Sequence, residues 1–266
     1  MDDTKFAASV NLDDIHLLNL SLDDAVTAID CALSARQPTR IAFVNADCAN
    51  IAARDPGYRA ALGDIDWVFV DGSGMRLAGE ILNQPVRDNV NGTDLFPRLC
   101  AALVGTGHRV FLLGARPGGA EAGGRGMRSR HPGIELAGSH HGYYRPGELP
   151  GLLRMIRASR ADVLLVAFGA PRQEQWINQH MDQTGATVVL GVGGLFDYYS
   201  GRIPRAPLWM RRLGLEWVFR LIQEPGRLWR RYLVGNLVFL ARTGRTWLRQ
   251  ARTPHPPTMT RNGESS

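Results

Sequence analysis

The sequence contains only three cysteines, Cys31, Cys48 and Cys100, and no C-x-x-C motif. Because their spacing is unpaired, a disulfide framework and a zinc site are not expected, and a reducing compartment suits the chain. The first fourteen residues are acidic and lack the apolar segment of a secretory signal. The longest uncharged apolar stretch near the C-terminus, Tyr232 to Ala241, has ten residues, about half of the roughly 20 that a spanning helix needs. We therefore expect a protein that does not cross a membrane.

Negative charge is scarce towards the C-terminal end of the chain. The overall net charge is +6, but residues 202–252 hold twelve arginines against two acids, Glu216 and Glu224. This segment therefore carries +10, and the rest of the chain carries −4. The arginines stand at positions 202, 205, 211, 212, 220, 227, 230, 231, 242, 245, 249 and 252. The chain thus divides into a mildly acidic globule and a cationic segment.

Up to about residue 200, short apolar runs alternate with helix-like segments. The runs with strand character are 15–20, 40–45, 67–70, 109–114, 162–169 and 187–194. Several are apolar on both faces, which favours buried parallel strands covered by helices. Helix starts are indicated by Ser21 with Asp24, by Asp94 and by Pro171. This alternation predicts an α/β domain over residues 1–200 with a doubly wound, mostly parallel, Rossmann-like sheet.

The pattern changes after residue 201. An apolar residue recurs every four positions, at Trp209, Leu213, Trp217 and Leu221. This spacing predicts an amphipathic helix, which is broken at 224–226 and followed by a second basic, aromatic helix. We therefore predict a basic amphipathic helical appendage over residues 201–252. The Pro/Thr/Ser-rich residues 253–266 are predicted to be a disordered tail.

Polar residues follow the predicted strands, at the sheet edge where ligands of open α/β sheets bind. Asp71 follows strand 67–70 and is the candidate general base, because a carboxylate over a pocket can take a proton from an attacking hydroxyl. The alternative is that Asp71 caps the next helix, since Asp before Gly-Ser-Gly is common turn chemistry.

Two other segments have phosphate or metal character. Residues 114–119 could cradle a diphosphate through backbone N–H groups, or form a plain strand–helix turn. Asp64 and Asp66 form a D-x-D pair, a pattern that holds a metal in many enzymes. The pair precedes its strand and so lies at the wrong sheet edge, which favours a solvated turn. No metal is expected.

The cationic appendage has three interpretations. Arginines that flank an apolar stripe with tryptophans at its boundary are typical of an interfacial membrane helix, which we favour. The stripe could instead pack on the core with its arginines solvated. Nucleic-acid binding is the least favoured of the three, although basic and aromatic residues alternate as it requires. Guanidinium groups can also bind a diphosphate bidentately.

Taken together, several segments resemble the WecG/TagA/CpsF family, glycosyltransferase family 26. The segments that carry the resemblance are 45–46, 71–74, 92–94, 111–118, 131–133, 142–144, 169–174, 191–201, 205–207, 214–217 and 223–225 with Arg227. They occur in order, from about residue 15 to about residue 240.

The resemblance implies inverting transfer of a hexose from a UDP-sugar to an undecaprenyl-diphosphate-linked sugar, without a metal or another cofactor. Asp71 is then the catalytic base, and Arg220, Arg227 and Arg230 meet the lipid diphosphate. Donor or acceptor contacts are expected from Asn45, Gly72, Asn89, Thr93, Asp94, Gly114, Gly169, Gln173, Glu174 and Gly193. The appendage would dock on the anionic cytoplasmic face of the inner membrane, and homo-oligomers would form in the absence of membrane.

Two positions bear on the donor sugar. Family members that use N-acetylmannosamine tend to have Thr two residues before the pocket Asn and Arg three residues before the Gly-Thr-Asp segment. This sequence has Phe43 and Asn89 there. We therefore expect glucose transfer in exopolysaccharide repeat-unit assembly. The alternative is transfer of N-acetylmannosamine or mannosaminuronic acid for teichoic acid or enterobacterial common antigen-type glycans.

Two other classes of function stay open. A nucleotide-dependent oxidoreductase is the more distant, because the glycine fingerprint of the first strand–helix turn is absent. A non-catalytic protein that binds membranes or nucleic acid through its arginines is the other.

Overall fold

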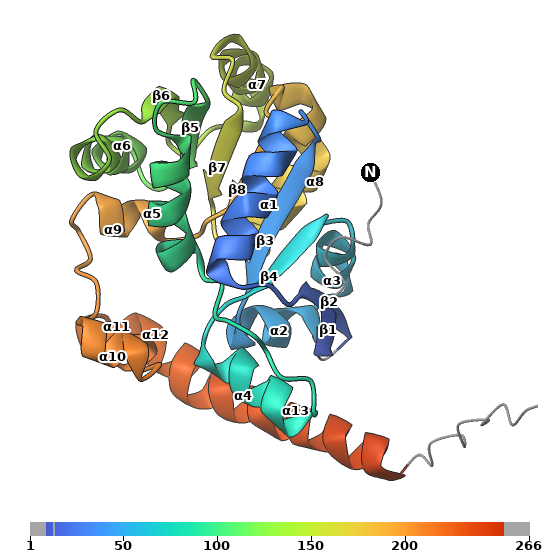
Figure 1. Cartoon of the computed structure of the whole chain (residues 1–266). Coiled ribbons are helices and arrows are strands. Elements are labelled where there is room, and N and C mark those ends of the chain that lie inside the picture. The colour runs from blue at the N-terminus through green and yellow to red at the C-terminus, as the bar shows by residue number, and fades with distance from the viewer. Residues whose placement is uncertain (1–8, 13, 253–266) are drawn as a thin grey trace, which may run out of the picture.

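A central eight-stranded sheet organises the computed structural model, which describes residues 9–12 and 14–252 (Figure 1). The strands are β1 (Ser9–Leu12), β2 (Ile15–Leu18), β3 (Thr39–Val44), β4 (Trp67–Val70), β5 (Arg109–Gly114), β6 (Glu135–His140), β7 (Val163–Ala167) and β8 (Val188–Gly191). Their order is β1-β2-β4-β3-β8-β7-β5-β6, and only β1 and β2 pair antiparallel among these neighbours. The predicted α/β fold with a mostly parallel sheet is confirmed.

Helices cover both faces of this sheet. One buried cluster gathers side chains of α1 (Leu22–Ser34), α5 (Gly92–Leu103), α6 (Gly119–Arg130) and α9 (Leu195–Tyr199). The other gathers side chains of α2 (Ala46–Ala52), α3 (Pro56–Gly63), α4 (Ser73–Ile81), α7 (Leu149–Ala158) and α8 (Arg172–Thr184), with the short η2 (Pro146–Glu148) before α7. Strand β3 alternates between them: Ile41 and Phe43 face the first cluster, Ala42 and Val44 the second. Such two-sided burial explains the continuous apolar strands.

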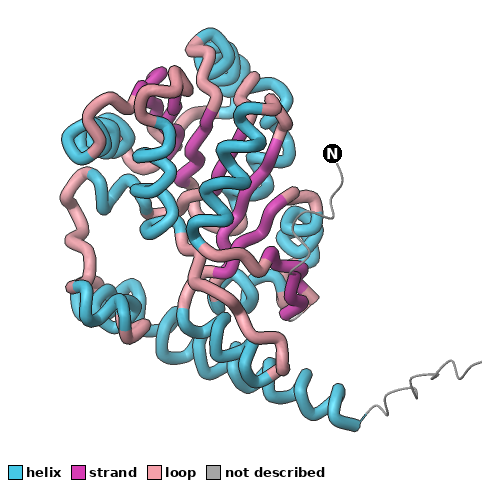
Figure 2. Tube along the Cα trace, viewed as in Figure 1, coloured by secondary structure: helices cyan, strands magenta, loops and turns pink. Residues whose placement is uncertain are grey.

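The C-terminal segment folds as a chain of helices along one end of the sheet domain (Figures 1 and 2). They are α10 (Leu208–Arg212), α11 (Glu216–Gln223), α12 (Pro225–Trp229), the π-helical η3 (Arg230–Val234) and α13 (Gly235–Arg252). Helix α13 contacts α2 and α4, and its fully buried Phe239 joins the second cluster. The Asn50 side chain of α2 also donates to the Gly235 carbonyl at 2.7 Å. Residues 253–266, the predicted disordered tail, lie outside the described residues.

The prediction of one continuous helix through Trp209 and Leu221 is wrong. Helix α10 ends at Arg212 and α11 begins at Glu216, because Gly214 between them adopts a left-handed φ of +70°. A side chain at Gly214 would also crowd Ser73, whose Cβ would lie 3.1 Å from the added Cβ. The Ser73 hydroxyl donates to the Gly214 carbonyl at 3.2 Å. This turn brings α11 over the start of α4.

Most of the predicted helix starts are confirmed. Ser21 and Asp24 form a capping box at α1, and α8 begins directly after Pro171. Helix α5 begins two residues before Asp94, with Asn91 as its cap. In the described part of the chain, no helix is both long and apolar enough to span a bilayer.

Candidate active site

A pocket of about 600 Å³ lies at the carboxyl ends of the parallel strands. The segments that follow β3, β4, β7 and β8 form its floor and sides, and side chains of α11, α12 and η3 form the opposite wall. The chain runs from β3 to its neighbour β4 and then crosses to β5 on the other half of the sheet. The pocket therefore lies at the point where the strand order reverses, the usual ligand crevice of such sheets.

Asp71 directly follows β4 and lines this pocket, half-buried. Its backbone N–H donates to the Val44 carbonyl, which fixes the residue beside the end of β3. The alternative that Asp71 caps the next helix is wrong, because Gly72 is the cap of α4 and no side-chain cap bond is present there. Burial raises the Asp71 pKa, while the Asn45 hydrogen bond and the charges of Arg231 and Arg220 oppose that rise.

Asn45 fixes the direction in which Asp71 is held. Its Oδ1 accepts the free N–H groups of Asp47 and Cys48 at 3.1 Å each, as the cap of α2. The amide can then present only its N–H side to the pocket, and Nδ2 donates to Asp71 Oδ2 at 3.3 Å. A carboxylate that accepts this bond keeps its other oxygen available for a proton.

The segment from 89 to 94 forms a second polar wall. Asn89 Oδ1 accepts from the Gly72 N–H at 2.6 Å, and thereby holds the turn that carries Asp71. Asn91 caps α5 and accepts from Thr93 Oγ1 at 2.6 Å. Asp94 pairs with Arg205, and also with Arg211 at 3.4 Å. The start of α5 is thus tied to the beginning of the appendage.

Gln173 joins the loops that follow β7 and β8. It is 4% exposed, and its Oε1 accepts from the N–H groups of Gly169 and Gly193, each at 3.1 Å. Both glycines have left-handed φ values, +76° and +52°, which aim these N–H groups at one acceptor. Its Nε2 donates to Glu174 Oε1 at 2.8 Å. One buried amide therefore sets the shape of two pocket loops.

Glu174 and Gly114 lie outside the pocket lining, although both were expected to contact a substrate. Glu174 is fully buried and supports Gln173 from behind, and burial raises its pKa to about 6. Gly114 permits close packing, since an added Cβ would lie 2.6 Å from the Ala167 carbonyl oxygen. Asp66 lies at the opposite end of β4, where its carboxylate accepts from the Arg40 N–H, as the solvated-turn interpretation predicts.

Arginines of the appendage face the carboxylates across the pocket. Arg220 and Arg227 line it, and Arg220 lies 5.4 Å from the Tyr198 ring centroid. Arg230 is exposed, stacks on Trp229 and does not line the pocket. Arg231, which the sequence did not distinguish from its neighbours, does line it.

Arg231 is held in place by an ion pair. Its Nε lies 3.0 Å from Asp47 Oδ2 at the start of α2, so its other guanidinium donors remain available.

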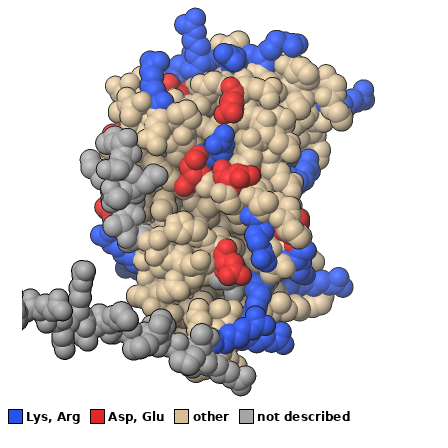
Figure 3. All heavy atoms as spheres, turned by 90° about the vertical axis from the view of Figure 1, so that its right-hand side faces the viewer, with Lys and Arg blue, Asp and Glu red and all other residues tan. Residues whose placement is uncertain are grey.

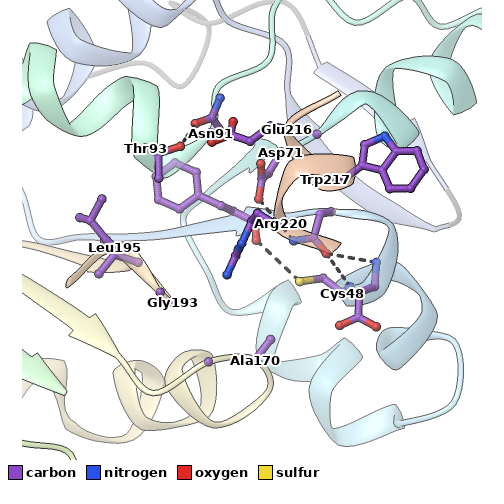
Figure 4. A pocket seen from close by; sticks show the side chains of 18 of the residues that line it. Cys48, Asp71, Asn91, Thr93, Ala170, Gly193, Leu195, Glu216, Trp217 and Arg220 are labelled. Carbon is purple, nitrogen blue, oxygen red and sulfur yellow. Dashed lines mark hydrogen bonds between the residues drawn. The ribbon is translucent and has the colours of Figure 1, made fainter. Parts of the chain in front are cut away.

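In Figure 4, Asp71 and Arg220 lie close together at the centre, with Glu216 and Trp217 of α11 beside them. Burial also raises the pKa of Glu216, which Arg205 opposes. Figure 3 shows basic side chains spread over one face of the molecule, most densely towards its upper and lower ends, with acidic side chains among them in the middle.

This arrangement has the components of a group-transfer site for an anionic substrate. A carboxylate of raised pKa can accept a proton, backbone N–H groups lie at glycine-rich loops, and guanidinium groups can hold phosphates. Among the described residues, no three His, Cys, Asp or Glu side chains are grouped as metal ligands.

Comparison with known proteins identifies the family. The sequence model of the Glycosyl transferase WecG/TagA/CpsF family matches residues 10–253. The chain belongs to this family.

Two relatives with curated names illustrate it. The N-acetylglucosaminyldiphosphoundecaprenol N-acetyl-beta-D-mannosaminyltransferase of Bacillus subtilis (strain 168) is 33% identical over 193 residues, which cover 73% of this chain and 74% of the relative. The enzyme of the same name from Staphylococcus aureus (strain MW2) is 32% identical over 200 residues, 74% of this chain and 78% of the relative. The expected WecG/TagA/CpsF membership is confirmed, and it favours a glycosyltransferase over the oxidoreductase and the non-catalytic alternatives. Neither name is that of a glucosyltransferase, so the relatives support the N-acetylmannosamine alternative better than glucose.

Proposed function

We propose that this protein transfers N-acetylmannosamine from a UDP-activated donor to a sugar carried on undecaprenyl diphosphate. The names of the two relatives support both the transferred sugar and the lipid-linked acceptor. The observation that carries the proposal is the half-buried carboxylate of Asp71, held over a pocket of about 600 Å³ whose opposite wall contains arginines. Such a pocket has room for a nucleotide-sugar and for the end of an acceptor.

Asp71 acts in this proposal as the general base of a single in-line displacement. The acceptor hydroxyl oxygen bonds to the anomeric carbon while the bond from that carbon to the UDP oxygen breaks. The hydroxyl proton passes to Asp71, and the configuration inverts. The charge that develops on UDP is stabilised by the N–H groups of the glycine-rich loops and by a guanidinium group. UDP leaves, and Asp71 returns its proton to water.

The arginines of the appendage hold the acceptor's diphosphate in the same proposal. Arg220 and Arg227 line the pocket, and Arg231 joins them from η3. Arg230 is better suited to a surface role, because it is exposed and stacks on Trp229. The appendage would rest on the anionic cytoplasmic face of the membrane as a peripheral anchor, and would mediate self-association when no membrane is present. Its exposed apolar side chains support both roles.

Glucose remains a second candidate donor because of two pocket residues. Phe43 lines the pocket and its ring lies against Gly92, where an added Cβ would be 3.7 Å from the ring. Asn89 uses its Oδ1 to accept from the Gly72 N–H, so that oxygen is not free for the donor. Both features differ from the residues that we associate with an N-acetylmannosamine pocket.

A donor panel tests the proposal directly. The protein is incubated with undecaprenyl-diphospho-N-acetylglucosamine and, in parallel, with undecaprenyl-diphospho-glucose. Each acceptor is offered UDP-N-acetylmannosamine, UDP-glucose and UDP-mannosaminuronic acid, and products are identified by mass spectrometry and NMR. We expect a β-linked N-acetylmannosaminyl product on the N-acetylglucosamine acceptor. If only glucose is transferred, UDP-glucose is the donor and the N-acetylmannosamine assignment is wrong. If none of the pairs gives a product, the proposed transferase activity is refuted.

A further inference from the structure

A second hollow adjoins the active-site pocket. It is a groove of about 620 Å³ between α4 on one side and α11 and α13 on the other. Its lining is mainly apolar and includes Leu77, Leu213, Trp217, Leu233, Leu237 and Leu240. We call this surface the apolar groove.

The apolar groove is continuous with the active-site pocket. Six residues line both spaces: Ser73, Gly74, Gly214, Trp217, Tyr232 and Asn236. Ser73 and Gly74 are only two and three positions beyond Asp71, so the boundary between the two spaces lies beside the proposed base. A molecule bound in the pocket can therefore extend past these shared residues into the groove.

The described residues leave several apolar side chains of this groove uncovered. Leu237 is 70% exposed, Leu213 67%, Leu233 47% and Leu77 42%. Apolar side chains gathered in a concave surface of this kind mark a binding site, because their hydration is unfavourable. The volume lies within the range of about 300–1,000 Å³ that is usual for small-molecule sites.

The two spaces differ in chemistry. The pocket side of the boundary carries Arg220, Arg227 and Arg231, whereas the charged residues of the groove lining, Arg76, Glu80 and Arg212, are exposed. A ligand that spans the boundary should therefore have an anionic group at one end and a hydrocarbon chain at the other. A prenyl diphosphate has this form.

We propose that the apolar groove binds the first isoprene units of the lipid acceptor, next to the diphosphate. This assignment rests on the proposed function. It separates the groove from the other exposed apolar residues of the appendage, such as Trp209, Ile222 and Val238, which do not line it and are available to a bilayer. The groove acts as a guide: it takes the chain out of the pocket and fixes the sugar end beside Asp71.

The direct test is binding of farnesyl diphosphate and of inorganic diphosphate to the full chain, without membrane or detergent. Trp217 lines both spaces, so a change in the protein's tryptophan fluorescence that is lost in Trp217→Phe, supported by calorimetry, reports binding. We expect farnesyl diphosphate to bind at least tenfold more tightly than diphosphate, because the groove would bury its hydrocarbon. Leu237→Asn or Leu77→Asn, in opposite walls of the groove, should each weaken farnesyl diphosphate about tenfold and leave diphosphate unchanged.

Val238→Asn is the matched control, since Val238 is also on α13, is 51% exposed and lies outside the groove lining. It should bind both ligands as the wild type does. Equal affinity of the wild type for the two diphosphates would overturn the proposal, as would equal losses in the Leu237 and Val238 variants. Self-association that Leu237→Asn abolishes, and that farnesyl diphosphate does not compete with, would assign the groove to a second copy of the chain.

A transfer assay separates this proposal from the proposed function. Acceptors with the same sugar diphosphate and one, two, three or four isoprene units are compared in solution. We expect KM to fall with each unit until the groove is filled, and Leu237→Asn to flatten this dependence without a change in kcat. Transfer that is independent of the number of isoprene units would refute the proposal for the groove and leave the proposed transferase function intact. If no acceptor reacts while farnesyl diphosphate still binds, the proposed function fails and the prenyl site stands.

Discussion

Replacing Asp71 with Asn removes the proposed base while the shape of the side chain is kept. Asn45 caps α2 through its Oδ1, so its Nδ2–H can still donate to the new amide oxygen. General-base catalysis contributes about 10²–10⁴-fold in rate, or about 3–5 kcal/mol of the barrier at 1.36 kcal/mol per factor of ten. We therefore expect kcat to fall by that factor and the KM values of both substrates to change little.

Folding gives the internal check on this variant. Burial raises the pKa of Asp71, so the folded state holds the ionised carboxylate less favourably than the unfolded chain does. At pH 8 the Asn variant should then be as stable as the wild type or more stable in thermal unfolding. Asp66→Asn is the matched control, because it makes the same change at the other end of β4, outside the pocket. An Asp71→Asn enzyme within tenfold of wild-type kcat, or an Asp66→Asn enzyme with the same loss, would refute the assignment.

Four further substitutions test individual residues of the site and its support. Asn45→Ala removes a hydrogen bond that lowers the pKa of Asp71, so the acid limb of the kcat/KM profile should move to higher pH; an unmoved limb contradicts the contact. Burial raises the pKa of Glu174 from 4.5 to about 6, so stability should fall as pH rises through that window, by about 2 kcal/mol. Glu174→Gln should abolish that slope in urea unfolding between pH 4 and 8, and a retained slope places the titration elsewhere. Arg231→Ala should raise the acceptor KM about tenfold and leave the donor KM unchanged, whereas Arg230→Ala should change neither KM. A larger effect of Arg230→Ala on the acceptor KM would favour Arg230.

The sheet and the residues at its strand ends could be predicted from the sequence because each depends on local pattern. A strand buried on both faces has to be apolar throughout, and β3, β7 and β8 all have this signature. Once the strands are placed, parallel order brings Asn45, Asp71 and Gly169 to one edge.

Two edge strands were missed for the converse reason. β1 has only four residues and alternates exposed and buried positions, and β6 (ELAGSH) contains a single large apolar residue, Leu136. The place of β6 depends on contacts distant in sequence, such as the approach of Gly138 to the Phe111 ring. Local sequence patterns do not reveal contacts between residues that are far apart in the sequence.

The arginines show how backbone geometry limits sequence analysis. Positions 230 and 231 are both neighbours of position 227 on a regular helix, at i+3 and i+4, so 3.6-residue periodicity cannot choose between Arg230 and Arg231. The π-helical turn of η3 (Arg230–Val234) changes the phase of the helix there. With that phase, Arg231 pairs with Asp47 at the pocket and Arg230 stacks on Trp229 outside it.

The hydrogen bond from Ser73 to the Gly214 carbonyl links the turn that carries Asp71 to the C-terminal helices. Lifting those helices from the sheet domain would remove a wall of the pocket and, at the same step, break a hydrogen bond made two residues from the proposed base. A substrate that bound before the C-terminal helices were in place would meet a pocket without its arginine-bearing wall. The pocket is therefore complete only when the C-terminal helices are packed on the sheet domain.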